Sequence, residues 1–271
     1  MQLTSFDDIN RKHRHIFLSP HLDDVVYSCG GTLGVQVSCG LQPLVITVFA
    51  GIPSPALTLS PFATQIERGM QWKPAPGVTS LVEARRKEDA TALDLLQADY
   101  LWLDYLDAIY RGNPAYYTRN EQLIGGNVHL QDMWIEKELA ENLLALQRRL
   151  PDAVWYAPLA IGRHVDHQIV CSAADQLAQR GAKVNFYEDF PYVLREGSRE
   201  TRLKELGGQL EPGLVEMSEM LPLRIEASER YASQISINFD SKEAMHEAMK
   251  KYTHGIRPVE TVYLEEYWTN R

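Results

Sequence analysis

Residues 16–24 read IFLSPHLDD, three large apolar residues followed by a short turn that carries a histidine and two carboxylates. The apolar part predicts a buried strand that ends at the turn. At such an end His21 and Asp24, three residues apart, can both turn toward one metal ion, while Asp23 between them stays free to act as a base. This is the outline of a hydrolytic zinc site. The structural alternative is that the two aspartates only cap the helix that follows.

A second polar cluster lies far away in the sequence. Residues 162–167 read GRHVDH and again follow an apolar run, over 153–159. Alone, this cluster could be a surface helix start in which Asp166 is the N-cap and His164 and His167 are solvated. Both clusters, however, follow buried-strand patterns and open helices, which is where open α/β sheets place their ligand crevices. The joint arrangement favours a metal site.

These two clusters resemble the signatures of the PIG-L/LmbE-type zinc-dependent N-deacetylases. Members of that family carry Pro-His-x-Asp-Asp near the N-terminus and His-x-Asp-His in the middle, matched here at residues 20–24 and 164–167. The chain departs from the pattern at Leu22, where many members have proline, and that position supplies no ligand. It also has Gly162 where some members place a tyrosine, so any role of that hydroxyl must be filled from elsewhere or be missing. Weaker matches extend the resemblance over residues 14–195, at 83–89, 103–107 and 187–192.

The resemblance implies a role for each residue of the two signatures. Asp23 would be the general base, and His164, protonated by pairing with Asp166, would donate to the oxyanion while Asp166 orients it. The implied ligands of one Zn²⁺ per chain, with other divalent metals allowed, are His21, Asp24 and His167.

The implied activity is removal of an acetyl group from an N-acetylglucosamine-type sugar or sugar conjugate by metal-activated water. Three alternatives stay open: an amidase on another small-molecule amide such as a thiol-sugar conjugate, a metal-dependent phosphoesterase, and a non-catalytic sugar-binding protein. Among substrate-binding candidates, Asp107 matches a family segment whose acid binds sugar hydroxyls. Arg163 could contact a substrate phosphate or face solvent. The remaining candidates are Arg85 and Arg86, near the start of a helix, and Tyr187 and Glu188, at a strand end.

Apolar runs that alternate with helical patterns predict an α/β, Rossmann-like fold: a mostly parallel sheet with helices on both faces and the metal site at the C-terminal ends of the strands. The expected strands are 15–20, 44–50, 100–105, 153–159 and 183–188. The expected helices are 25–38, 80–97, 132–149 and 167–180. Two long segments interrupt this pattern. Residues 51–79 contain five prolines and are expected to have little regular structure, and 106–130 is rich in Gly, Asn and Tyr. Both are expected to rim the crevice as substrate-shaping loops, the alternative being a mobile surface insertion.

The composition fits a globular protein, with 271 residues, 45% hydrophobic and 23% charged. We expect a single domain over 1–271, in which 196–271 could form a small C-terminal lobe or wrap the sheet, ending in a β-like stretch over 260–264. A net charge of −9 disfavours nucleic acid and anionic membranes as partners and favours neutral or cationic substrates. No apolar run approaches the ~20 residues of a membrane span and no signal peptide is evident, so a cytoplasmic location is expected. The three cysteines suggest reduced thiols, and the sequence allows a homo-oligomer.

Overall fold

Within the residues that the computed structural model describes (1–73, 77–207, 210–259 and 261–270), seven strands form one sheet in the order β3-β2-β1-β4-β5-β7-β6. The neighbours among β1 to β5 pair in parallel, and β7 pairs antiparallel with both β5 and β6. The strands are β1 (His15–Ser19), β2 (Leu44–Thr47), β3 (Asp99–Trp102), β4 (Val154–Pro158), β5 (Lys183–Tyr187), β6 (Leu210–Glu216) and β7 (Leu264–Asn270).

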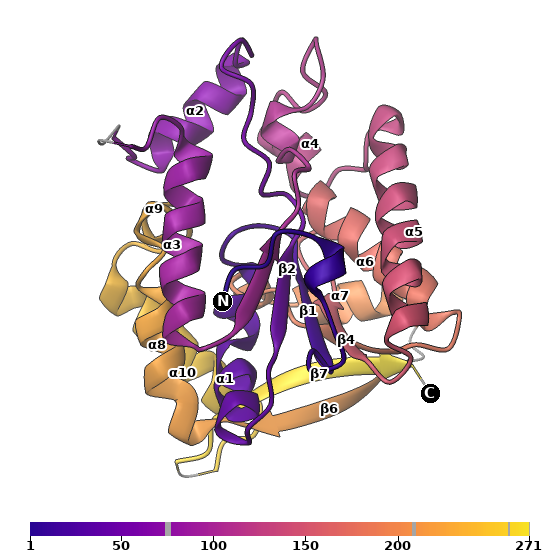
Figure 1. Ribbon diagram of the computed structural model, residues 1–271. Helices are drawn as coiled ribbons and strands as arrows, with labels where there is room; N and C mark the ends of the chain where they lie inside the picture. The colour runs from indigo at the N-terminus through magenta and orange to yellow at the C-terminus, as the bar shows by residue number, and fades with distance from the viewer. Residues whose placement is uncertain (74–76, 208–209, 260, 271) are drawn as a thin grey trace.

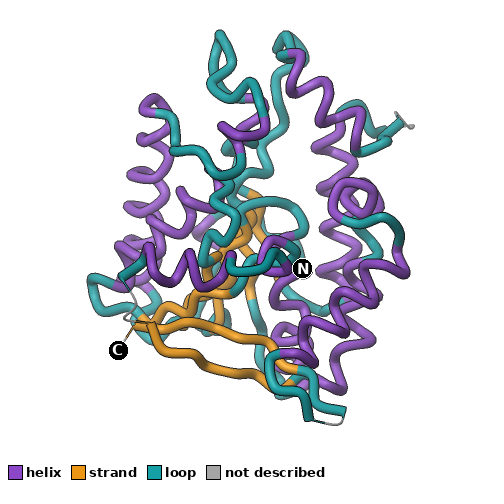
Figure 2. The backbone as a smooth tube through the Cα atoms, turned by 180° about the vertical axis from the view of Figure 1, so that it is seen from behind, coloured by secondary structure: helices purple, strands orange, loops and turns teal. Residues whose placement is uncertain are grey.

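Helices cover both faces of the sheet (Figure 1 and Figure 2). One face carries α1 (Asp24–Ser38), α3 (Leu81–Leu95), α8 (Leu221–Ser228), α9 (Ala232–Asn238) and α10 (Lys242–Gly255). The other carries α5 (Met133–Arg149) and α6 (Val165–Ala178), and the shorter helices are α2 (Pro61–Gly69), α4 (Asn120–Leu123) and α7 (Ser198–Glu205). The predicted α/β, Rossmann-like architecture is therefore confirmed.

The core has two apolar layers, one on each side of the sheet, and a third buried cluster that includes Phe62, Tyr110 and Tyr117. Alternation along β1 divides its side chains between the two layers, because successive strand residues point to opposite faces. Ile16 and Leu18 join the layer under α5 and α6, and Phe17 joins the layer under α1 and α3. All three are completely buried, so β1 is the buried strand that the apolar run predicted.

The five predicted parallel strands and the four predicted helices are all present, with ends that differ by a few residues. The expectation of little regular structure over 51–79 is wrong at α2. That helix forms because the Ser60 side chain accepts from the Ala63 N–H and Pro61 occupies the first helical turn, where its missing N–H costs nothing. Residues 74–76 of the segment lie outside the described residues.

The C-terminal region wraps the sheet and extends it. β6 and β7 add an antiparallel pair at the β5 edge. The β-like stretch expected over 260–264 is placed too early, since β7 begins at Leu264, and Glu260 lies outside the described residues. No helix in the described part of the chain has the length and apolar character needed to cross a membrane.

Candidate active site

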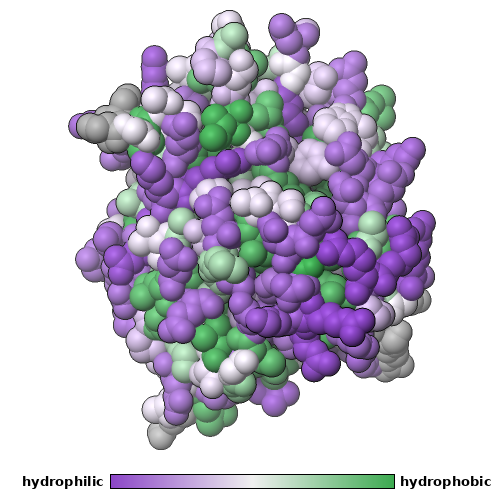
Figure 3. Space-filling model, viewed as in Figure 1, coloured by the Kyte–Doolittle hydropathy of each residue, from purple (hydrophilic) through white to green (hydrophobic). Residues whose placement is uncertain are grey.

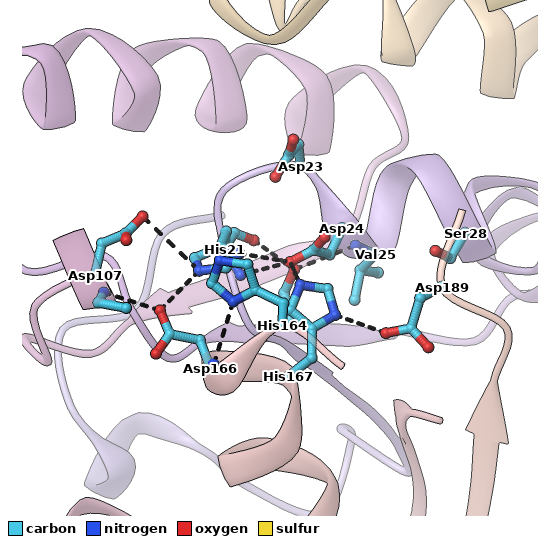
Figure 4. Close-up of polar contacts among 12 residues, drawn as sticks. His21, Asp23, Asp24, Val25, Ser28, Asp107, His164, Asp166, His167 and Asp189 are labelled. Carbon is cyan, nitrogen blue, oxygen red and sulfur yellow. Dashed lines mark hydrogen bonds and ion pairs between the residues drawn. The ribbon is translucent and has the colours of Figure 1, made fainter. Parts of the chain in front are cut away.

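A pocket lies at the C-terminal ends of the parallel strands, above β1 and β4. These two strands are neighbours, with β2 and β3 continuing the sheet on one side and β5 on the other. The direction of the chain's progress across the sheet reverses between them, and such a switch point leaves a crevice between the loops. Both signature clusters reach this crevice, from the β1 to α1 turn and from the β4 to α6 turn (Figure 4).

Three side chains of the two clusters meet around one carboxylate oxygen. Asp24 Oδ2 lies 3.3 Å from His21 Nδ1 and 3.3 Å from His167 Nε2. Metal bonds of 2.0–2.2 Å at tetrahedral angles separate neighbouring donor atoms by about 3.3–3.6 Å. Moreover, His167 Nε2 is buried without a hydrogen-bond partner among the described residues. The separations of Asp24 from both histidines therefore match those between ligands of one tetrahedral metal ion.

The imidazole of His164 also belongs to this cluster. Donor nitrogens of His21, His164 and His167 lie within 4.8 Å of one another, so three buried imidazoles could hold an ion. The His164 Nδ1, however, already accepts the backbone N–H of Asp166 at 3.2 Å. We therefore give more weight to Asp24, whose oxygen has the ligand spacing to both other histidines.

The alternative that the aspartates are only helix caps does not hold in the structure. Asp23 is the N-cap residue of α1, but its side chain makes no capping hydrogen bond. Asp24 turns back and accepts the His21 N–H at 2.8 Å. Both carboxylates are buried at the pocket instead of facing a solvated helix end.

Asp23 stands apart from the ring cluster in Figure 4 and faces the pocket. Its Oδ1 lies 3.4 Å from Nη2 of Arg85. Burial, followed by the charge of Asp24, raises the pKa of Asp23 to about 7. A cation bound at Asp24 would offset part of that repulsion. The carboxylate can therefore accept and return a proton near neutral pH.

The carboxylate of Asp166 does not pair with His164 as the sequence analysis expected. It accepts instead from His21 Nε2, at 2.9 Å, and from the Ala108 N–H, at 3.0 Å, and it pairs with Arg111. His164, and not Asp166, is the N-cap of α6. Burial and the neighbouring His21 lower the pKa of His164 well below its ordinary value. Since its Nδ1 accepts a hydrogen bond, the neutral ring carries its proton on Nε2, which is a donor.

Asp189, which the sequence analysis missed, holds the other ring nitrogen of His167. Its Oδ1 lies 2.6 Å from His167 Nδ1, and its Oδ2 accepts the Ile161 N–H at 2.8 Å. A metal-binding histidine commonly donates its second N–H to a carboxylate in this way. The signal was present at 187–192, where the sequence analysis chose Tyr187 and Glu188 instead.

Those two residues lie outside the pocket. The Tyr187 hydroxyl donates to the Leu18 carbonyl at 2.9 Å, within the core. Glu188 accepts from Trp268 Nε1, at 3.0 Å, and from the Tyr252 hydroxyl. Neither side chain lines the site, so both contribute to packing on the side of β7 and α10.

The other substrate-binding candidates divide into two pairs. Asp107 and Arg85 line the pocket, with Asp107 Oδ2 at 3.8 Å from both Arg85 Nη1 and His21 Nε2. Arg86 turns away to the Ala50 carbonyl and Asp104. Arg163 forms an ion pair with Glu205, 3.2 Å away, at a separate surface hollow.

The walls of the pocket come from three segments distant in sequence. α2 supplies Ile66 and Met70 follows its end, residues of the 120–124 region supply a second wall, and α9 supplies the third. The two long loop segments therefore do rim the crevice, as expected. The wall residues of the second and third segments are Asn120, Leu123, Ile124, Gln234, Ile237 and Asn238.

Outside the crevice, the face shown in Figure 3 is mainly hydrophilic, with apolar residues in separate areas.

Tyr192 occupies the space that the missing side chain at Gly162 leaves free. A Cβ added at Gly162 would lie 2.7 Å from the Tyr192 ring, and the glycine has a φ of +84°. The same ring lies edge-on to His167, with centroids 5.6 Å apart, and lines the pocket. Among the described residues, no hydrogen bond reaches its hydroxyl. Burial, and then the charges of Asp24 and Asp23, raise the pKa of Tyr192, so it remains a donor.

Comparison with known proteins agrees with this geometry. The family model for PIG-L, described as GlcNAc-PI de-N-acetylase, matches residues 16–178. The chain is 33% identical over 206 residues to the 2'-N-acetylparomamine deacetylase of Niallia circulans, covering 71% of this chain and 74% of that protein. It is 29% identical over 252 residues to the protein of the same name from Streptomyces fradiae, covering 90% and 83%. The solved zinc-inhibited form of teicoplanin deacetylase Orf2 has a TM-score of 0.75 at 26% identity, over 94% of this chain and 97% of that one.

An open α/β sheet with buried imidazoles and carboxylates at its switch point is the architecture of an enzyme with a candidate metal site. The chain belongs to the PIG-L family. It is accordingly a deacetylase, a hydrolase that acts on amide bonds.

Proposed function

We propose that this chain removes the acetyl group from an N-acetylated glucosamine unit of a small glycoside, with one zinc ion held by His21, Asp24 and His167. The observation that carries the proposal is the pair of 3.3 Å separations around Asp24 Oδ2, with Asp23 beside them in a pocket. The choice of zinc rests on the donor set, two imidazoles and one carboxylate, which is typical of zinc sites. The similar structure of teicoplanin deacetylase Orf2 is described as a zinc-inhibited form.

The residues of the pocket divide the chemistry between them. A divalent ion bound at this site supplies a water of lowered pKa and polarises the amide carbonyl. Asp23 takes the proton of the attacking water and passes it to the leaving amine. His164 donates its Nε2–H to the tetrahedral oxyanion, as a neutral donor and not as the imidazolium that the sequence analysis expected. The Tyr192 hydroxyl provides a second donor, from a ring that contacts His167 and lines the pocket.

The substrate class follows from the pocket and from the relatives. Asp107 and Arg85 offer an acceptor and donors beside His21, which suits the hydroxyl groups of a sugar ring. The two curated relatives are named for 2'-N-acetylparomamine, which favours an N-acetylated aminoglycoside as the substrate over a glycopeptide. The net charge of −9 suits such a cationic molecule.

A single metal ion per chain is favoured over a binuclear phosphoesterase centre. A second possible donor group, His21 with Asp107 and Asp166, lies on the far side of the His21 ring. Its carboxylates are already neutralised, Asp107 by Arg85 and Asp166 by Arg111. A buried guanidinium therefore lies beside each carboxylate of this group, which disfavours a second cation there.

We further propose that residues 1–271 act as one catalytic domain, because α9 from the C-terminal region completes the pocket. We propose a cytoplasmic location for it, as the sequence analysis expects. Cell fractionation would test the location.

The test is acetate release from 2'-N-acetylparomamine by purified protein. We expect release by zinc-loaded protein, loss after chelation, and recovery when one equivalent of zinc is returned. Chelator-insensitive release would contradict the metal mechanism. Release from an N-acetylated glycopeptide but not from the aminoglycoside would contradict the substrate class.

A further inference from the structure

The segment between β3 and α5 does more than shape the pocket, because it reaches the back of the candidate metal site. The N–H of Ala108 donates to the Asp166 carboxylate at 3.0 Å, and the Arg111 guanidinium pairs with the same carboxylate. Asp166 in turn holds Nε2 of His21 at 2.9 Å, on the ring edge opposite Asp24. Residues of the segment therefore contact a candidate ligand through one intermediate side chain.

A second carboxylate and two aromatic rings contact the Arg111 side chain. Its Nε lies 3.1 Å from Asp132 Oδ2, and Asp132 also accepts the Tyr117 hydroxyl at 2.8 Å. The guanidinium lies over the rings of Phe49, at 4.9 Å, and Tyr117, at 5.6 Å. Two ion pairs and two neighbouring rings restrict the Arg111 side chain, while its Nε and Nη1 have no hydrogen bond among the described residues.

The charges of this chain of contacts are removed from water. The exposed fraction is 6% for Arg111, 1% for Asp132 and 0% for Asp166. Burying one arginine between two carboxylates costs desolvation energy that a hydrophobic core would not require. The Arg111 guanidinium lies against the Asp166 carboxylate and favours its ionised form, and the same carboxylate faces His21 Nε2 at 2.9 Å.

We propose that Arg111 and Asp132 are positioning residues, which fix the tautomer and orientation of His21 through Asp166. In this arrangement the 107–132 segment couples the wall of the substrate pocket to the metal site. A carboxylate that accepts from the second N–H of a ligand histidine raises the basicity of the ligand nitrogen. The proposal rests on the proposed function in one respect, the assignment of His21 as a ligand.

The experiment measures zinc affinity by competition with a chromophoric chelator, together with the visible absorption spectrum of Co²⁺-substituted protein. The variants are Arg111→Gln, Arg111→Lys and Asp132→Asn. The matched control is Asp99→Asn, another buried carboxylate, paired with His13 at 3.1 Å at the opposite end of the sheet.

We expect zinc to bind about 10- to 100-fold more weakly to R111Q and D132N, with an altered cobalt spectrum. R111K should lie between R111Q and the wild type, since lysine keeps the charge but cannot reach both carboxylates. D99N should bind zinc as the wild type does, even if it unfolds more easily. Wild-type affinity and spectrum in both R111Q and D132N would overturn the proposal; should R111Q fail to fold, D132N decides alone.

A further variant, His21→Ala, separates this proposal from the proposed function. If H21A loses zinc while R111Q and D132N bind it normally, only the positioning role fails. If H21A binds zinc as tightly as the wild type does, the ligand assignment itself is wrong.

Discussion

Asp23 and Asp24 are neighbours in sequence and have opposite surroundings. Asp24 lies between two histidines, whereas Asp23 faces the pocket and the Arg85 guanidinium. We predict that Asp23→Asn lowers kcat by a factor of about 10²–10⁴, because the amide cannot accept the proton of water. Zinc content should remain one per chain, since Asp23 is not among the proposed ligands. Loss of zinc together with activity would contradict the assignment of Asp23 as the base.

The Tyr192 hydroxyl has no partner in the described structure and faces the site. We predict that Tyr192→Phe lowers kcat on the order of 10²-fold, the cost of removing one oxyanion donor, and leaves KM and zinc affinity nearly unchanged. Tyr105→Phe is the matched control, because that hydroxyl donates to Glu138, at 2.8 Å, away from the pocket. Equal kinetic effects of the two substitutions would show that the Tyr192 hydroxyl has no part in the reaction.

The sequence alone predicted which residues of the two signatures form the site, but not which side chains contact them. Spacing along the chain brings His21 and Asp24 to one strand end, so local geometry suffices to group them. The contacts of Asp189 with His167 and of Asp166 with His21 depend on how two turns face each other across the sheet. Local sequence carries no record of that relation. The expectation that Asp166 orients His164 came from the family resemblance, whereas the Asp166 carboxylate contacts His21 and Arg111.

Among the elements, α1 packs unusually close to the C-terminal region at Gly31. A Cβ added there would lie 2.7 Å from Glu265 Oε1 and 2.7 Å from the Met217 side chain. We predict that Gly31→Ala lowers the free energy of unfolding by about 1–3 kcal/mol through overpacking, measured by denaturant unfolding. Gly255→Ala, in α10, is the control, since nothing lies within 4 Å of its added Cβ. It should be neutral or stabilising by up to about 1 kcal/mol.

Asp89 on α3 joins three elements, accepting from Trp102 Nε1 and the Tyr231 hydroxyl, each at 2.7 Å. Burial raises the pKa of Asp89 from 3.8 to about 6, although both hydrogen bonds lower it. Since the folded pKa exceeds the unfolded one, its contribution to stability is fully present below pH 3.8 and is lost as the pH rises through 6.

We therefore predict a pH-dependent difference between the wild type and Asp89→Asn. The free energy of unfolding of chelator-treated protein is measured for both proteins at pH values from 4 to 7. Over this range the difference between them should change by about 3 kcal/mol in favour of the variant. A difference that stays constant with pH would contradict the raised pKa.

The elements that could be predicted are those with a strong periodic pattern and clear ends. The Ser80 to Glu83 capping box and the turn at Gly181, with a φ of +87°, both stand where the sequence places such signals. α2 was not predicted because the five prolines over 51–79 indicate a loop, whereas Ser60 and Pro61 among them form a helix start. The pattern was present, but the composition around it favoured a loop.

For the whole molecule, the sequence predicted the sheet and the place of the site but not how the C-terminal quarter contributes. β6 and β7 alternate weakly, and their antiparallel pairing at the β5 edge is a long-range contact. α9 reaches the pocket only because that region folds back over α1 and α3. The pocket wall formed by α9 therefore depends on long-range packing and could not be predicted from local sequence.

The most direct test of the central claim is an anomalous-scattering map at the zinc edge from crystals of zinc-loaded protein. We predict one peak per chain, about 2.0–2.2 Å from His21 Nδ1, His167 Nε2 and a carboxylate oxygen of Asp24. A peak bonded to His164 in place of Asp24, or a second peak between Asp107 and Asp166, would contradict it.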